Sequence, residues 1–176
     1  MSTFYHGTDI DSAISICDKI VLKKSSKRTD FGPGFYVTNN IETAKTWAFR
    51  KAAVRRKEAS IVYVEFDEDA VSDMVQRFSG DLRWGRFVIN NRNGYDYVNR
   101  IDFKEHNLDA RYPITYGRIA DYEVRDIARK LYQTGEILES IEGIFNPFYS
   151  FQYAFHSERA LSFINSTRYE KIEREV

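Results

Sequence analysis

The sequence contains one cysteine, Cys17, and only three histidines and three prolines in 176 residues. A single cysteine cannot form an internal disulfide, and the histidines show no metal-ligand spacing, so a zinc cluster is excluded. No stretch approaches the roughly 18 consecutive apolar residues of a membrane span. The first residues lack the charged and apolar regions of a signal peptide. We therefore expect a cytoplasmic protein that binds no metal and does not enter a membrane.

The chain also has no net charge, because 26 basic residues balance 26 acidic ones. No global field steers the molecule toward nucleic acid, so such a partner requires a local patch. Two basic stretches, at residues 19–28 and 50–57, offer one. Stretches of this kind are usually solvated surface, but they could also hold a pyrophosphate or a nucleic acid.

The length is that of one domain, and neither a repeat nor a linker divides it, so we expect a single domain over residues 1–176. Apolar alternation predicts strands at residues 2–8, 34–38, 61–66 and 149–156, and more weakly at 95–98 and 114–116. Helical spacing predicts helices after an Asp11 or Ser12 cap, from 41 to 52, at 81–91, at 124–131 and after Ser157. Strands and helices do not alternate regularly, which indicates an α+β fold.

Three segments, far apart in the chain, combine histidine, glycine and aromatic residues. They are Tyr5-His6-Gly7-Thr8, Asp30-Phe31-Gly32-Pro33-Gly34-Phe35-Tyr36-Val37-Thr38 and Phe151-Gln152-Tyr153-Ala154-Phe155-His156. Singly, each is more typical of structure than of function. A glycine-proline-glycine run usually marks only a turn, and a lone tyrosine or tryptophan is usually a core residue. Their order and spacing give the set more weight.

The set resembles the ADP-ribosyltransferase superfamily, in the branch named for its His-Tyr-Glu triad, which includes diphtheria toxin and the poly(ADP-ribose) polymerases. His6-Gly7-Thr8 matches the first motif of that branch, and Phe31 to Tyr36 matches the second. Trp47 supplies the aromatic residue expected eleven positions after the tyrosine. A family of uncharacterised bacterial proteins, often found near toxin–antitoxin genes, is similar along nearly the whole chain. The resemblance implies a split, mixed or antiparallel sheet with flanking helices.

The resemblance also implies that NAD is the co-substrate. Nicotinamide would lie between the rings of Tyr36 and Trp47, since a flat cation is well held by aromatic faces. The backbone N–H and C=O of Gly7 would bind the carboxamide, with glycine allowing a close approach. His6 would bind a ribose hydroxyl, and Thr8 would help at the adenosine side. The remaining cofactor-binding residues expected are Phe31, Gly32 and Gly34.

Gln152 stands where the family carries its catalytic glutamate. That glutamate accepts a hydrogen bond from the ribose and stabilises an oxocarbenium-like sugar. Glutamine keeps the acceptor oxygen but has no charge and cannot act as a base toward a hydroxyl. We therefore expect transfer of one ADP-ribose unit without elongation. A second carboxylate could compensate, with Asp121 as the first candidate and Asp30 as the second. A glutamate placed at position 152 is expected to retain NAD cleavage.

The leading hypothesis is thus a mono-ADP-ribosyltransferase, acting as a bacterial toxin or effector on a protein or nucleic-acid acceptor, with an antitoxin protein as a further possible partner. The alternatives are an NAD glycohydrolase and a catalytically weak NAD-binding or ADP-ribose-binding module. An RNA 2′-phosphotransferase fits poorly, because it requires a second histidine and an arginine in place of Tyr36 and Gln152. Arg92 could line the cleft, whereas His156 is expected to pack or cap.

Overall fold

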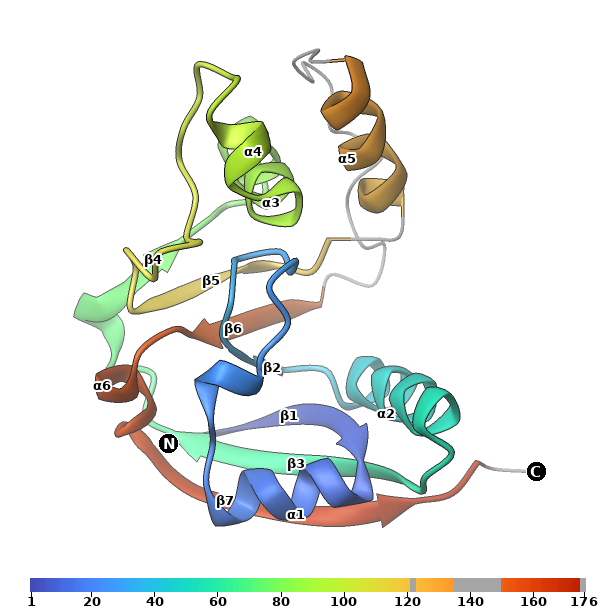
Figure 1. The fold of residues 1–176 in the computed structure, drawn as a ribbon. Helices are drawn as coiled ribbons and strands as arrows, with labels where there is room; N and C mark the ends of the chain where they lie inside the picture. The colour runs from blue at the N-terminus through green and yellow to red at the C-terminus, as the bar shows by residue number, and fades with distance from the viewer. Residues whose placement is uncertain (121–122, 135–149, 175–176) are drawn as a thin grey trace.

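Seven strands form one sheet in the order β4-β5-β6-β2-β1-β3-β7 (Figure 1). The computed structural model describes residues 1–120, 123–134 and 150–174. The strands are β1 (Ser2–Asp9), β2 (Phe35–Thr38), β3 (Ala59–Phe66), β4 (Val75–Arg77), β5 (Ile114–Arg118), β6 (Phe151–Phe155) and β7 (Ile164–Ile172). Only the β4–β5 pair is parallel, so the sheet is mixed. The expected single-domain α+β fold is confirmed.

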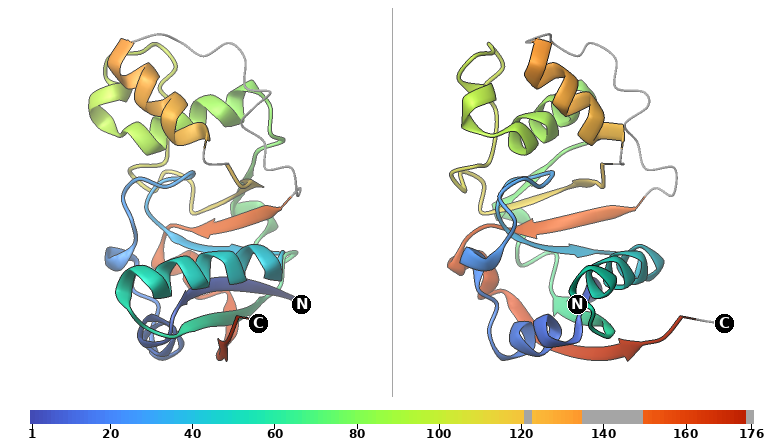
Figure 2. Two further views of the ribbon diagram at one scale, coloured as in Figure 1. Left: turned by 90° about the vertical axis from the view of Figure 1, so that its right-hand side faces the viewer. Right: turned by 45° about the vertical axis from the view of Figure 1, so that its right-hand side comes forward.

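Helices flank both ends of this sheet. They are α1 (Ile10–Asp18), α2 (Ile41–Arg55), α3 (Leu82–Asn93), α4 (Tyr95–Val98), α5 (Glu123–Thr134) and α6 (Glu158–Leu161), with short 3-10 helices at Leu22–Lys24 and Ser72–Met74. Helices α3, α4 and α5 gather beyond β5, whereas α1 and α2 lie with β1, β3 and β7 (Figures 1 and 2). The glycine-rich loop between α1 and β2 lies between these two groups.

Local patterns located most elements, with two corrections. Asp9, rather than Asp11 or Ser12, caps α1, because its carboxylate accepts the N–H of Ser12 at 3.1 Å. Residues 95–98 form helix α4 instead of a strand. Their alternating apolar pattern fits either element over so short a run. The packing of Tyr97 beside Ile89 and Leu131 accompanies the helical form.

The two faces of the sheet carry different helices. Helix α1 packs on the face that presents Phe4, Val62 and Val64. Helix α2 packs on the other face, through small residues that meet Ala59: Ala48 and Ala52. Side chains alternate between faces along a strand, and directly paired residues share a face. Gly7, Tyr36 and Gln152 therefore all belong to the face that carries α2.

The backbone of helix α2 lies directly against Gly7 of β1. A Cβ atom at Gly7 would lie 1.9 Å from the carbonyl oxygen of Ala44 and 2.8 Å from the backbone nitrogen of Ala48. Both are backbone atoms, so no side-chain rotation can relieve the overlap. The lack of a side chain at Gly7 thus allows helix α2 to pack closely on β1.

We predict that Gly7→Ala destabilises the fold by about 1–3 kcal/mol or more, because overpacking here must displace helix backbone. Urea unfolding followed by circular dichroism measures the change. Thr3→Ala, at an exposed position of the same strand, serves as the control and should stay within about 0.5 kcal/mol of wild type. Equal stability of Gly7→Ala and wild type would contradict the packing of α2 on β1.

Candidate functional site

The sheet opens between β1 and β2. Strand β1 pairs with β3 over eight residues, but its register with β2 consists of one pair, Tyr5 with Thr38. Strand β2 continues to pair with β6 over all four of its residues. We call the unpaired stretch, residues 6–9 of β1 opposite residues 35–37 of β2, the β1–β2 opening.

Gly7 directs its backbone polar groups into this opening. The N–H of Ile10 donates to the carbonyl oxygen of Glu58 at 3.0 Å, on the β3 side. The N–H and C=O of an antiparallel strand turn to the other side at each successive residue. Gly7, three residues earlier, therefore directs one donor and one acceptor toward β2.

Tyr36 is the residue that Gly7 would face in a continued ladder. The N–H of Asn39 donates to Phe151 on the β6 side at 3.3 Å, so by the same alternation Tyr36 directs its carbonyl toward β1. The His6 ring takes this carbonyl instead, with Nδ1 lying 2.6 Å from the Tyr36 oxygen. An imidazole thus stands where a ladder hydrogen bond would be, and the ladder pair of Gly7 is not formed.

The surroundings of His6 fix its protonation state. A carbonyl only accepts, so Nδ1 carries the proton, and Nε2 faces the Lys51 ammonium at 3.4 Å as an acceptor. The ring also stacks on Phe35, with centroids 5.0 Å apart. Burial and, to a smaller extent, the charge of Lys51 together lower the pKa of His6 to about 3. His6 is therefore neutral at physiological pH, and both of its nitrogens have protein partners.

Lys51 brings a cation to the same place from α2. Burial lowers the pKa of Lys51 to about 8, with a further contribution from Arg55. The Arg55 guanidinium is itself paired with Asp9 at 2.7 Å. At neutral pH Lys51 remains mostly charged, so the 50–57 stretch brings a cation into contact with His6.

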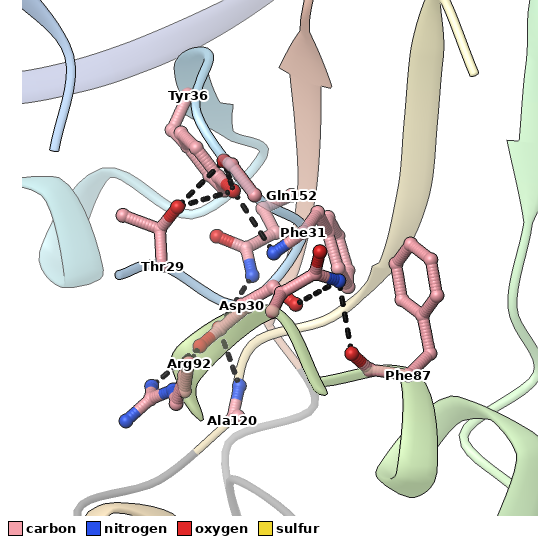
Figure 3. Close-up of polar contacts among 10 residues, drawn as sticks. Thr29, Asp30, Phe31, Tyr36, Phe87, Arg92, Ala120 and Gln152 are labelled. Atoms are coloured by element: carbon pink, nitrogen blue, oxygen red, sulfur yellow. Dashed lines mark hydrogen bonds and ion pairs between the residues drawn. The ribbon is translucent and has the colours of Figure 1, made fainter. Parts of the chain in front are cut away.

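The hydroxyl of Tyr36 ties down the glycine-rich loop (Figure 3). It accepts the N–H of Phe31 at 2.9 Å and lies 2.6 Å from the carbonyl oxygen of Gly32 and 2.9 Å from the Thr29 hydroxyl. Burial raises the pKa of Tyr36, so the phenol stays protonated. These contacts hold the Tyr36 ring against the glycine-rich loop that precedes β2.

Gln152 is fixed by a buried carboxylate. Its Nε2 donates to Oδ2 of Asp30 at 2.8 Å, and the backbone N–H of Ala120 donates to the same oxygen at 3.1 Å. Arg92 binds the other oxygen of Asp30 through both Nε, at 2.8 Å, and Nη2. Figure 3 shows the Gln152 amide between Tyr36 and Asp30, with its nitrogen toward the carboxylate. Gln152 and Asp30 are only 8% and 6% exposed.

The sequence did not identify this network as a unit. The sequence alone indicates Arg92 only as a residue that could line the cleft, and Asp30 only as a second candidate carboxylate. The structure joins both of them to Gln152. Asp121, the first candidate carboxylate, lies outside the described residues. No local sequence pattern links positions so far apart. The one local signal is Asp30 itself, a charged residue directly before the Phe31-Gly32-Pro33-Gly34 turn.

The other predicted cofactor-binding residues divide by exposure. Trp47 lies on α2 with 42% of its surface exposed, and the Arg50 guanidinium lies 5.5 Å from its ring centroid. Phe31 is fully buried among Phe78 and Phe87. Thr8 is 2% exposed and, by alternation, belongs to the α1 face, away from Gly7. The side chains of Phe31 and Thr8 are thus both buried.

The two glycines of the loop have steric reasons of their own. Gly32 has φ +85°, and a Cβ there would lie 2.5 Å from the carbonyl oxygen of Asn107. A Cβ at Gly34 would lie 2.7 Å from Nδ1 of His156. That histidine packs as expected, with Nδ1 donating to Pro33 at 2.7 Å and Nε2 lying 2.9 Å from the Thr115 hydroxyl. Both glycines therefore let the loop pass close to its neighbours.

Over residues 2–165 the chain matches the family described as "Protein of unknown function (DUF3990)". The chain belongs to this family. No curated protein and no solved structure matches this chain. Because the DUF3990 description names no activity, function has to be argued from the geometry of the site.

Two further features of this DUF3990 protein concern metals and membranes. Among the residues that the structure describes, no three His, Cys, Asp or Glu side chains gather as a metal site. Within the same residues, no helix is long and apolar enough to cross a membrane. A cavity of about 80 Å³ beside α3 is lined by residues that include Arg86, Tyr97 and Leu131, and none of the site residues lines it.

The low pKa values of two histidines predict acid lability. Burial lowers the pKa of His6 to about 3 and that of His156 to about 4, from 6.5. Below pH 6.5 the unfolded chain binds protons that the folded chain refuses, so stability falls with pH until the folded values are reached. At pH 5 each histidine should cost about 2 kcal/mol relative to pH 7.5.

Urea unfolding at pH 7.5 and pH 5 measures this loss. His6→Gln and His156→Gln, which stay neutral throughout, should each remove about half of it. A loss of the same size in the double variant His6→Gln/His156→Gln would show that other groups cause the acid lability.

Proposed function

We propose that this protein binds NAD at the β1–β2 opening and transfers a single ADP-ribose unit to a macromolecular acceptor. The observation that carries the proposal is the backbone of Gly7, which directs an N–H and a C=O into the opening beside Tyr36. A primary carboxamide offers one acceptor and one donor at matching positions. Two backbone groups on a rigid strand can bind it with little loss of entropy.

Two aromatic residues suit the nicotinamide ring. Tyr36 shares the α2 face with Gly7 and is held rigidly through its hydroxyl. Trp47 comes from α2 itself and keeps 42% of its surface accessible. A positively charged pyridinium is attracted by aromatic faces, so the pair supports binding of the oxidised dinucleotide.

Charge at the opening fits the rest of NAD. The Lys51 ammonium, beside His6, is a compact positive charge that can bind an anionic pyrophosphate. Nε2 of His6 is an acceptor whose 3.4 Å contact to Lys51 is long for a hydrogen bond. A ribose hydroxyl could replace Lys51 as its donor, which would free the ammonium for phosphate.

The chemistry assigned to Gln152 is orientation of the nicotinamide-side ribose. In the reaction the C1′–N1 bond breaks, its electron pair passes to the ring nitrogen, and nicotinamide leaves as a neutral molecule. The sugar passes through an oxocarbenium-like state, and the acceptor attacks C1′ with loss of its own proton. Because Nε2 of Gln152 is bound by Asp30, its Oε1 is the atom left to accept the ribose 2′-hydroxyl.

NAD hydrolysis and NAD binding without turnover are the competing functions. Water can replace the acceptor at the same site, which gives the glycohydrolase. The neutral side chain of Gln152 favours the binding module. An acceptor that is a protein or a nucleic acid, and an antitoxin that covers the site, belong to the proposal as the partners of a bacterial toxin.

The decisive experiment is incubation of the protein with NAD labelled in its adenylate part, with and without cell lysate. We expect label on a macromolecule as a single unit, because Gln152 has no basic oxygen that could activate a bound ribose hydroxyl for elongation. Gln152→Ala should lower the rate by about 10–1000-fold through loss of the orienting acceptor. Protease and nuclease digestion of the product then identify the acceptor class.

Each other product has its own meaning. Free ADP-ribose alone identifies a hydrolase, and unchanged NAD that still binds identifies a binding module. A ladder of polymers refutes single transfer. Full activity of Gln152→Ala would assign the ribose to another residue, with Asp121 the first to examine.

Trp47→Ala should weaken NAD binding by about 1–3 kcal/mol, the scale of one lost aromatic partner. The exposure of Trp47 makes a folding defect small, so calorimetric titration of NAD can be read directly. Val54→Ala, at an 85% exposed position of the same helix, is the control and should bind as wild type. An unchanged affinity in Trp47→Ala would leave this tryptophan as a surface residue.

A further inference from the structure

Asp30 is buried, and both of its oxygens are fully engaged. Oδ1 binds the Arg92 guanidinium, and Oδ2 accepts from Ala120 and from Gln152. Release of Arg92 would leave a buried carboxylate without its counter-charge, and release of Gln152 would leave Oδ2 with one donor fewer; both are costly in a buried place. The Gln152 amide is therefore held in one orientation by a charge.

That charge acts on more than orientation. Hydrogen bonds in series polarise one another, and low solvent exposure strengthens the effect. A carboxylate that accepts from Nε2 draws positive charge to the nitrogen end of the amide and leaves Oε1 more negative. Oε1 is also the atom that the proposed function assigns to the ribose, so the carboxylate lies one amide away from the developing cation.

We propose that Asp30 is a positioning residue that supplies, through the amide of Gln152, the negative charge that a glutamate at position 152 would carry itself. This rests on the proposed function. As the C1′–N1 bond breaks and its electrons pass to nicotinamide, the positive charge grows on C1′ and O4′ of the ribose. The Asp30 carboxylate stabilises that charge electrostatically and exchanges no proton with it. The interaction strengthens as the cation forms, so it raises kcat more than it tightens NAD binding.

The same contact changes the expectation for a glutamate at position 152. Its carboxylate would replace an N–H···O hydrogen bond of 2.8 Å with two oxygens that both only accept. Two carboxylates at this distance repel each other unless they share a proton. Gln152→Glu should therefore lose activity, although glutamate is the residue that the resembling enzymes carry. Exchange of the pair, Asp30→Asn with Gln152→Glu, restores one charge and one donor between the two side chains.

The test is a double-mutant cycle on NAD cleavage, followed by nicotinamide release, with NAD affinity and thermal unfolding measured on the same preparations. Asp30→Asn should lower kcat by roughly 10–100-fold, the effect of one unit charge at this range, with less than about a threefold change in KM. Gln152→Glu should lose at least about tenfold. The double variant should be at least about tenfold faster than either single variant.

Glu105→Gln is the matched control. Glu105 is likewise bound by an arginine through two nitrogens, with Arg83 at 2.8 and 2.6 Å, and it lies outside the site. It should lower stability as the Asp30 variant does, but leave kcat unchanged. Any loss of kcat in Asp30→Asn that the control reproduces is structural and overturns the proposal.

The remaining outcomes also decide the question. A wild-type protein that neither binds nor cleaves NAD ends the proposed function. If the wild type cleaves NAD but Asp30→Asn is equally fast, the proposed role of Asp30 is refuted and the proposed function stands. The same conclusion follows if the losses of the two single variants add up in the double variant. Should Asp30→Asn fail to fold, Gln152→Glu suffices, since a kcat equal to or above that of wild type contradicts the transmitted charge.

Discussion

The arrangement of the site depends on the hydrogen bonds and the ion pair of the Asp30 carboxylate. A buried charge is tolerated only when donors and a counter-charge surround it. Here the donors come from α3, from the segment that follows β5 and from β6. They lie 62, 90 and 122 positions after Asp30 in the chain. Satisfying one side chain therefore fixes a helix, a strand end and a central strand relative to the glycine-rich loop. The position of Gln152 is a consequence of this requirement.

A second constraint opens the sheet beside that network. Backbone carbonyls that leave a ladder need other partners, and the Tyr36 carbonyl obtains one from His6. The strands can then separate after one pair without leaving this acceptor unsatisfied. Since the same tyrosine holds the loop through its hydroxyl, one residue couples the opening to the loop that carries Asp30. The two constraints thus act on adjacent parts of one unit.

What the sequence could predict was local. Alternating apolar residues located β1, β2, β3 and β6, and the cap Ser157 followed from a hydrogen bond that spans three residues. The helix at 95–98 depends on which neighbours arrive from elsewhere, so pattern alone misjudged it. The partners of Asp30 are the extreme case, because no short-range rule connects Arg92 or Gln152 to it. Three of the expected strands are β1, β2 and β6, which carry His6, Tyr36 and Gln152 and are neighbours in the sheet.

Gln152 shows why a single substituted position is a poor guide to a site. In the sequence, a glutamine where the resembling family carries glutamate indicates a lost charge and predicts transfer without elongation. In the structure its nearest polar neighbour is an aspartate, and a hydrogen bond between two side chains requires one donor and one acceptor. A glutamate beside Asp30 offers only acceptors, whereas a glutamine beside an asparagine offers a donor but carries no charge. Only a mixed pair keeps both the hydrogen bond and one negative charge. The chain has this mixed pair, with the negative charge on Asp30 and an amide oxygen at position 152.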